Sequence, residues 1–243
     1  MAMRILVTND DSICAPVLPK LVQWAQKLGE VTVVVPKFQQ SGKSHGIELH
    51  EPYEVVRVED ICGAETYTVD STPADCVRFA LMGMKRQFDL VVSGINKGYN
   101  MGKDIMYSGT TGAVFEASAQ GIPAVAFSSS FDGSEMAAEH LDVVWQYMQE
   151  NRLWEMGSLY NVNIPPQGGQ IRITKQGGPY YSDDFKPVGE NKYKACGICI
   201  HENKGDLTID TDAVVGGYIS ISPLTTIRVD MELYNKLKEL NKD

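Results

Sequence analysis

Residues 4–11, RILVTNDD, decide the fold class. Their apolar stretch has the length of a strand that is buried on both faces, and polar residues follow it at once. Pro16–Leu28 then spaces its apolar side chains as an amphipathic helix does, and Val31–Val35 predicts a second buried strand. A strand, a helix and a strand in this order form one βαβ unit, the building block of a mostly parallel sheet.

Short buried strands continue to alternate with helices along the first half of the chain. The expected elements are a hairpin-like segment at Tyr53–Val69, a helix capped by Thr72, a strand at Phe88–Ser93, a helix at Gly109–Gln120, a strand at Ala124–Ser128 and a helix at about Glu135–Glu150. This alternation predicts an α/β fold of the Rossmann-like, three-layer kind, with helices on both faces of a mostly parallel sheet.

From about residue 151 the pattern changes to proline-rich and glycine-rich connections between alternating strands. The elements expected there are strands at Gln170–Thr174 and Tyr218–Ser222 and a C-terminal helix near Asp230–Leu240. We predict a single domain over residues 1–243, with a core of about 1–150. The remaining part, about 151–243, would form a β-rich extension on the sheet or an oligomerisation arm.

The overall composition restricts the class of partner. The formal net charge of −9 argues against binding a nucleic-acid duplex or an anionic membrane, because both require a positive surface. The chain shows neither an export signal nor an apolar run as long as a membrane span, so we expect a cytoplasmic protein. Five scattered cysteines, with a single C-x-x-C at Cys196 and Cys199 in an extended stretch, indicate reduced thiols rather than a disulfide framework or a zinc site.

Two adjacent acids, Asp10 and Asp11, follow the first strand, at the edge where open parallel sheets bind ligands. If both are ionised and confined they repel each other, and a divalent cation is the usual remedy. The hydroxyl of Ser41 and the amide oxygen of Asn96 would complete an oxygen donor set that suits magnesium or manganese rather than zinc. An open alternative is that Asp10 caps the following helix and Asp11 is a solvated turn residue.

The segment Ser108–Gly112, SGTTG, places small residues at the start of a predicted helix. Free backbone N–H groups and the helix dipole attract an anion there, and the glycines allow it to approach closely. The segment therefore predicts a phosphate site. On the sequence alone, an ordinary N-cap at Ser108, with glycines that serve tight helix packing, stays open as the alternative.

Several well-defined phosphate-binding and catalytic motifs are incomplete or absent in this sequence. Gly42–Ser44 has the last residues of a phosphate-binding P-loop, but position 37 is a lysine where that motif requires glycine. No G-x-S-x-G nucleophile elbow occurs in the sequence. An aspartyl-phosphate mechanism would favour a second acid two residues after Asp10, and Ser12 stands there. A covalent intermediate is therefore disfavoured.

Five motifs, in this order along the chain, resemble the SurE (survival protein E) family of metal-dependent 5′-nucleotidases. They are Ile5–Asp11 (ILVTNDD), Ser41-Gly42, Ser71–Val77 (STPADCV), Val92–Asn96 (VSGIN) and Tyr107–Thr110 (YSGT). The resemblance extends from about Met3 to about Ser222. Because the spacing of the motifs matches as well, the resemblance is much more specific than any one of them.

The resemblance implies a role for each matching residue. It implies that one divalent cation, Mg²⁺ or Mn²⁺, is bound by Asp10, Asp11, Ser41 and Asn96, and that Asp10, Asp11 and Asn96 take part in catalysis. The residues that it implies near the substrate phosphate are Asn9, Gly42, Asn96, Ser108, Gly109 and Thr110. The implied reaction is the hydrolysis of nucleoside 5′-monophosphates by metal-activated water. Nucleoside 3′-monophosphates and short polyphosphate are further substrates in the family, and its members form homodimers or homotetramers through C-terminal exchange arms.

Two positions depart from the family pattern. Ser12 and Val17 stand where the family usually has glycine. If Ser12 adopts a left-handed backbone conformation, the strain is about 1 kcal/mol or more. The loop that carries both aspartates would then hold the metal ligands differently.

Two non-catalytic functions compete with the phosphatase interpretation. A signalling module that resembles a receiver domain also has paired acids after its first strand, but Ser93 and Gly94 stand where its phosphoacceptor aspartate is required. A nucleotide sensor of the same fold, which binds nucleotide and metal without turnover, is not separated from an enzyme by the sequence.

Overall fold

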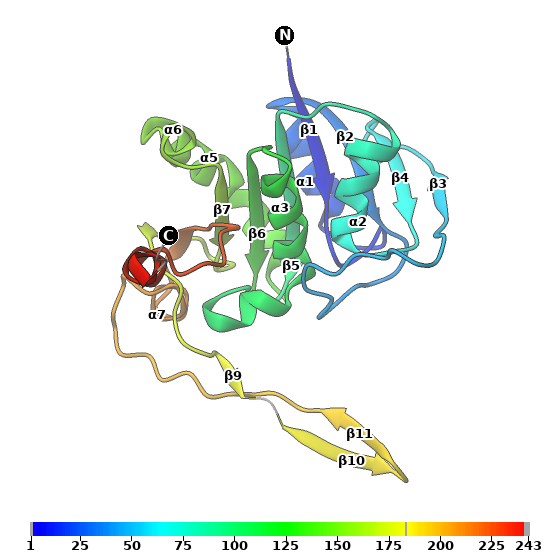
Figure 1. Ribbon diagram of the computed structural model, residues 1–243. Helices are drawn as coiled ribbons and strands as arrows, with labels where there is room; N and C mark the ends of the chain where they lie inside the picture. The colour runs from blue at the N-terminus through cyan, green and yellow to red at the C-terminus, as the bar shows by residue number, and fades with distance from the viewer. Residues whose placement is uncertain (1, 183, 241–243) are drawn as a thin grey trace.

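A nine-stranded sheet forms the middle layer of the described chain, residues 2–182 and 184–240 of this computed structural model (Figure 1). Its strand order is β3-β4-β2-β1-β5-β6-β7-β13-β8. The strands are β1 (Met3–Thr8), β2 (Gly29–Pro36), β3 (Val55–Arg57), β4 (Glu65–Val69), β5 (Leu90–Lys97), β6 (Ala124–Ser129), β7 (Leu159–Asn163), β8 (Ile171–Ile173) and β13 (Ile219–Pro223). In this order the strands from β4 to β7 run parallel, whereas β3 and β13 are antiparallel to β4 and β7.

Helices cover both faces of the sheet, because each strand sends alternate side chains to opposite sides. Ile5 and Val7 belong to a core that α1 (Leu18–Gln26) and α5 (Leu141–Glu150) complete, whereas Leu6 belongs to a core formed with α2 (Pro73–Arg78) and α3 (Gly109–Ala119). The other α-helices of the described residues are α4 (Ser134–Ala137), α6 (Leu153–Met156), α7 (Asp210–Val215) and α8 (Met231–Leu237). The predicted Rossmann-like, three-layer fold is confirmed.

Helix boundaries agree with the prediction where a capping signal is present. Thr72 caps α2 as expected, with its hydroxyl oxygen accepting the backbone N–H of Asp75 at 3.1 Å. The single helix expected at Glu135–Glu150 is wrong, because a 3-10 turn separates α4 from α5. At the break His140 has φ −101° and ψ −1°, and its ring lies 3.3 Å from the carbonyl oxygen of Pro166. The apolar spacing continues across this turn, so the sequence pattern does not reveal it.

Strand β5 continues past its predicted end at Ser93. After an irregularity in register, Asn96 and Lys97 pair again with β6. Gly94 lies in the irregular stretch with a φ of 134°, and a Cβ added there would be 2.3 Å from the carbonyl oxygen of Phe127. Only glycine fits this close approach. The longer strand carries Asn96 to the carboxyl edge of the sheet.

The chain beyond residue 151 adds strands to the same sheet. The sequence does not predict β7, LYNVN, because its two asparagines are polar although the structure buries both. Strands β8 and β13 lie within the segments predicted as strands, apart from Pro223, and α8 begins one residue after its predicted start, with a short 3-10 turn following it. Among residues 2–182 and 184–240, no helix combines the length and the apolar character that crossing a membrane requires.

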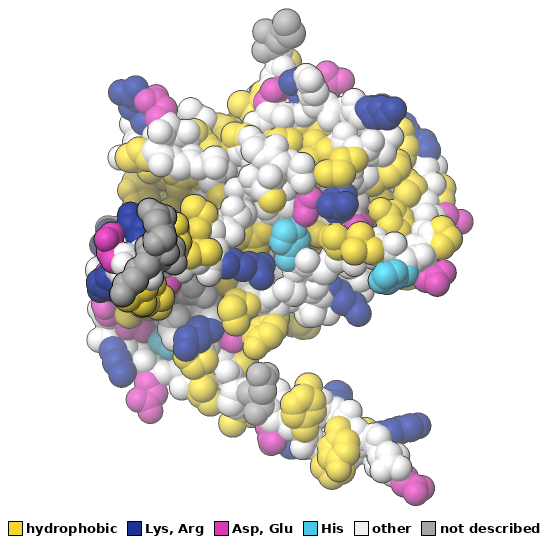
Figure 2. Space-filling model, viewed as in Figure 1, with side chains coloured by type: hydrophobic (Ala, Val, Ile, Leu, Met, Phe, Trp, Pro, Cys, Tyr) yellow, Lys and Arg dark blue, Asp and Glu magenta, His cyan; other side chains and the backbone are white. Residues whose placement is uncertain are grey.

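An arm formed by β9 (Tyr181–Ser182), β10 (Phe185–Gly189), β11 (Lys192–Ala195) and β12 (Ile198–Cys199) projects from the body of the molecule (Figure 1). β10 pairs with β11 and β9 with β12, both antiparallel. Figure 2 shows hydrophobic side chains on the outside of this arm, where Phe185, Val188 and Tyr193 are exposed. The extended conformation expected around Cys196 and Cys199 is confirmed, and both are free thiols.

Candidate active site

Asp10 lies at the carboxyl end of β1, buried between the loop that follows β2 and the start of α3. Its Oδ1 accepts a hydrogen bond from Thr110 Oγ1 at 2.6 Å, and its carbonyl oxygen accepts the backbone N–H of Gln40 at 2.8 Å. The structure therefore brings the first acid against the predicted phosphate segment, although one hundred residues separate Asp10 from Thr110.

Gly109 makes this approach possible. A Cβ added to Gly109 would lie 3.0 Å from Cβ of Asp10 and 3.3 Å from its Oδ2. Contacts of this kind are tighter than ordinary side-chain packing, so glycine lets the first turn of α3 reach the carboxylate. The N-terminus of α3 and the Asp10 carboxylate therefore belong to one site.

Asp11 is fixed by two donors that no sequence motif indicates. The backbone N–H of Lys97 donates to Asp11 Oδ2 at 2.9 Å, and Gln39 Nε2 donates to Oδ1 at 3.1 Å. Lys97 is the neighbour of Asn96, whose Nδ2 donates to the carbonyl oxygen of Gly98 at 2.7 Å. Gln39 follows β2 and Lys97 ends β5. Their place at the carboxyl ends of these strands is the feature of the sequence that could have identified them as site residues.

Burial sets the electrostatics of Asp10. The side chain is 5% exposed, and this desolvation raises the pKa of Asp10 from 3.8 to about 6. The hydrogen bond from Thr110 opposes the shift, and the charge of Asp11 adds to it. The alternative that Asp10 caps the following helix is wrong, since Val17 occupies the N-cap position of α1 and makes no side-chain capping bond.

Asn9 and Ser12 shape the loop that carries the two acids. Asn9 Nδ2 donates to the carbonyl oxygen of Ser12 at 2.9 Å, while Asn9 Oδ1 is buried without a hydrogen-bond partner in the described part of the chain. Ser12 has a φ of 74°, in the left-handed region where a side chain brings strain of about 1 kcal/mol. The second departure from the family pattern brings no such strain, because Val17 has a φ of −81°.

The remaining predicted site residues lie on the two neighbouring loops. Ser41 and Gly42 form an exposed turn directly after Gln40, and Gly42 has a φ of 70° with nothing within 4 Å of an added Cβ. Ser108 is the N-cap of α3, where its Oγ accepts the backbone N–H of Thr111 at 3.1 Å. Ser108 is therefore an N-cap, and its hydroxyl oxygen already accepts a hydrogen bond.

The donor set fits a hard divalent cation. Two carboxylates, one hydroxyl and one amide oxygen are the ligand types that Mg²⁺ and Mn²⁺ prefer. Within residues 2–182 and 184–240, no group of three or more His, Cys, Asp or Glu side chains is arranged to hold a metal. The buried Asp10 carboxylate is an oxygen ligand whose charge such a cation would balance.

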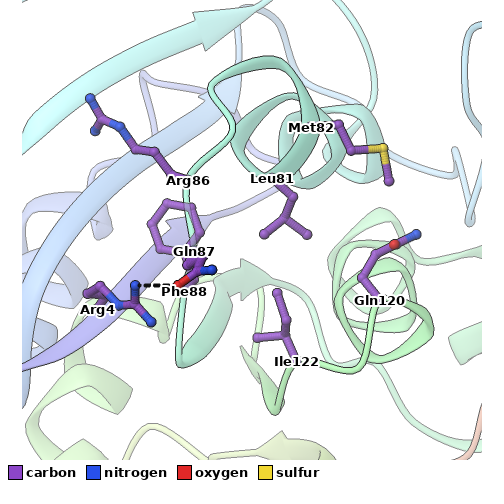
Figure 3. Close-up of a pocket in the computed structure, with 8 residues that line it drawn as sticks. All are labelled: Arg4, Leu81, Met82, Arg86, Gln87, Phe88, Gln120 and Ile122. Atoms are coloured by element: carbon purple, nitrogen blue, oxygen red, sulfur yellow. Dashed lines mark hydrogen bonds between the residues drawn. The ribbon is translucent and has the colours of Figure 1, made fainter.

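A hollow of about 390 Å³ at the amino ends of the strands is not part of this site (Figure 3). Phe88 and Ile122, which line it, precede the first residues of β5 and β6. In the same hollow Arg4 donates to the side-chain oxygen of Gln87 at 3.1 Å. Ligands of parallel sheets bind beyond the carboxyl ends of the strands, and this hollow lies at the amino ends.

Comparisons with known proteins identify the family of the chain. The model of the family "Survival protein SurE" matches residues 5–183. The proteins named 5′-nucleotidase SurE of Thermosipho melanesiensis and Caldanaerobacter subterraneus are 34% and 36% identical to the chain, over 99% and 98% of it and 98% of their own lengths. The crystal structure of the SurE protein from Aquifex aeolicus superposes with a TM-score of 0.79 at 30% identity, over 98% of this chain and all of that one. The chain therefore belongs to the SurE family.

Proposed function

We propose that this chain is a divalent-metal-dependent phosphomonoesterase that hydrolyses nucleoside 5′-monophosphates to nucleoside and phosphate. The observation that carries the proposal is the contact between Asp10 and Thr110, which joins an acidic pair to the N-terminus of a helix. An acidic pair suits a cation, and a helix N-terminus suits a phosphate. The names of the relatives, 5′-nucleotidase SurE, support the substrate class.

The residues that would hold the cation, Mg²⁺ or Mn²⁺, are Asp10, Asp11, Ser41 and Asn96. When bound, the cation would polarise the phosphate oxygens and lower the pKa of a neighbouring water. Asp10 and Asn96 come from strand ends, and Ser41 comes from a loop tied to Asp10 through Gln40. The acids need no covalent role in this scheme.

The other residues of the site position these groups. Thr110 orients the Asp10 carboxylate, and the backbone of Lys97 with the amide of Gln39 orients that of Asp11. The start of α3, at Gly109 and Thr110, would face the phosphate, and the helix dipole there would stabilise charge that develops on the phosphate oxygens. The backbone N–H of Thr110 also bonds the Asp10 carboxylate. Asn9 and Gly42 would line the same phosphate.

The proposal predicts that phosphate release depends on added metal and on Asp11. Purified wild type and Asp11→Asn would be assayed with nucleoside 5′-monophosphates, a nucleoside 3′-monophosphate and short polyphosphate, each with EDTA, Mg²⁺ or Mn²⁺. We expect turnover by wild type with metal, none with EDTA, and a loss of about a hundredfold or more in Asp11→Asn, because one charged ligand is gone while the shape is kept.

Two other outcomes would contradict the proposal. Activity that persists equally in EDTA or in Asp11→Asn would place the reaction elsewhere. Folded wild type that binds nucleotide and metal without releasing phosphate would favour the nucleotide sensor. The strained backbone at Ser12 would then be the first feature to test as the cause of the missing turnover. The 3′-monophosphate and polyphosphate arms test the wider substrate range separately.

We also propose that the chain forms homodimers or homotetramers. Helix α8 buries none of its residues, and Leu233 and Leu237 are 49% and 50% exposed. Several apolar residues of the arm are exposed as well. Exposed apolar faces of this kind are typical of association surfaces. We expect Leu233→Asp with Leu237→Asp to lower the mass measured by light scattering, whereas Val143→Asp, a change at an exposed valine of α5, should not. A monomeric wild type would contradict this proposal.

A further inference from the structure

Glu116 is a buried carboxylate on α3, with 5% of its surface exposed. Its Oε2 lies 2.8 Å from His45 Nε2, and its Oε1 accepts hydrogen bonds from Gln120 Nε2 at 3.1 Å and Arg78 Nη1 at 3.3 Å. The hydrogen bond with His45 is the largest influence that holds the pKa of Glu116 below its usual value. Burying a carboxylate is unfavourable without such partners, so these contacts keep it ionised inside the protein.

The loop that carries His45 crosses α3 at Gly112. A Cβ added to Gly112 would lie 2.2 Å from the carbonyl oxygen of Ser44, so the backbone of the loop rests directly on the helix. The same loop is tied to the residues before α3, because the backbone N–H of Ser44 donates to the carbonyl oxygen of Tyr107 at 3.0 Å and Ser44 Oγ to that of Met106 at 2.5 Å.

Glu116 provides a second point of attachment one helical turn further on. Gly112 and Glu116 are four residues apart and therefore share one face of α3. His45 follows Ser44 and reaches along that face to the carboxylate, with its ring stacked beside Phe115 at 6.4 Å between centroids and 29° between planes. The loop is thus held on α3 both by backbone packing and by a side-chain contact.

The loop and the helix that this contact joins both carry residues of the proposed active site. Ser41, a proposed metal ligand, lies in the same loop four residues before His45. Thr110, which bonds Asp10, lies in the same helix six residues before Glu116. We propose that His45 and Glu116 are positioning residues that fix the Ser41 loop against the phosphate-binding end of α3. The inference rests on the proposed function.

A purely structural role makes a different prediction. Arg78 bonds the same carboxylate but belongs to α2, and among the described residues its charged partners are Glu116 and Asp75 rather than Ser41 or His45. If Glu116 only stabilised the fold, loss of His45 and loss of Arg78 would have similar consequences. If His45 positions the loop, only its loss should change metal and substrate binding.

The test compares wild type with His45→Ala, His45→Gln and Arg78→Gln. Mn²⁺ affinity would be measured by calorimetry without substrate, kcat and KM with a nucleoside monophosphate, and Tm by thermal denaturation. We expect His45→Ala to weaken Mn²⁺ binding and to lower kcat/KM, each by about tenfold, because one hydrogen bond to a charged group is lost from the loop. His45→Gln, whose amide nitrogen can replace Nε2, should recover most of both.

Arg78→Gln should lower Tm while the dissociation constant for Mn²⁺ stays within about twofold of wild type. The inference is overturned if His45→Ala retains wild-type Mn²⁺ affinity and kcat/KM, or if Arg78→Gln impairs them equally. Wild type that fails to hydrolyse nucleotides would instead refute the proposed function, and the Mn²⁺ measurements on the same four proteins would still decide the positioning role.

Discussion

Replacing Asp10 by asparagine is expected to reduce phosphate release by about a thousandfold or more and, in the metal-free protein, to increase the free energy of unfolding above pH 6. The loss of activity follows from the removal of a charged oxygen from the proposed metal site. The gain in stability follows from the burial that raises the pKa of Asp10 to about 6. Activity and stability should therefore change in opposite directions.

The sign of the stability change follows from proton binding. The folded protein protonates Asp10 near pH 6, whereas the unfolded chain protonates it near the ordinary value of 3.8, so between these values the folded state binds more protons. Stability contributed by this group is therefore present at low pH and is lost as the pH rises to 6. Above pH 6 the ionised, buried Asp10 costs about 3 kcal/mol, a cost that asparagine avoids while still accepting the Thr110 bond.

Urea denaturation of EDTA-treated proteins between pH 4 and 8 would measure this difference. We expect the stability advantage of Asp10→Asn to be absent at pH 4, to grow up to pH 6 and to stay constant above it. Asp89→Asn is a control of opposite sign, because a hydrogen bond from Arg4 lowers the pKa of Asp89 to about 2, and its removal should destabilise the protein at neutral pH. An advantage of Asp10→Asn that is independent of pH would contradict the argument.

Replacing Gly112 by alanine is expected to lower kcat/KM by about a hundredfold, because displacement of a site loop by about 1 Å has effects of that size. The added Cβ would meet the backbone carbonyl oxygen of Ser44 at 2.2 Å, and a backbone atom cannot swing aside as a flexible side chain does. Alanine has a helix propensity about 1 kcal/mol better than glycine, so a stabilised and fully active variant would show that the loop moves freely.

Steady-state kinetics and Mn²⁺ titration of Gly112→Ala would be compared with Gly178→Ala. A Cβ at Gly178 has nothing within 4 Å, and the φ of Gly178 is not in the left-handed region, so this control should behave as wild type. Similar losses in the two variants would indicate that the effect does not come from the contact with Ser44.

The sequence identifies positions on single strands better than contacts between distant segments. Asp10 and Asp11 could be placed at the edge of the sheet because the apolar run before them has the pattern of a buried strand. The left-handed conformation of Ser12 could be anticipated because the family has glycine there. The first inference uses neighbouring residues, and the second uses a single position of the family pattern.

Contacts such as Thr110 to Asp10 and His45 to Glu116 join residues that are 100 and 71 positions apart. No periodicity or capping rule links residues at such distances, since the packing of whole elements brings them together. The same holds for Gln39 and Lys97, whose bonds to Asp11 depend on how two loops meet. The boundary of β5 was missed because a glycine irregularity, rather than an apolar pattern, carries the strand onward.

The close packing of α3 limits the substitutions that this helix can accept. Eight of its eleven residues are buried, and its two glycines touch Asp10 and Ser44. Random mutagenesis should therefore recover few tolerated substitutions along this helix. Attempts to evolve a new substrate preference in the laboratory would be better aimed at the exposed loops around it, where side chains can be exchanged without shifting the backbone on which both halves of the site depend.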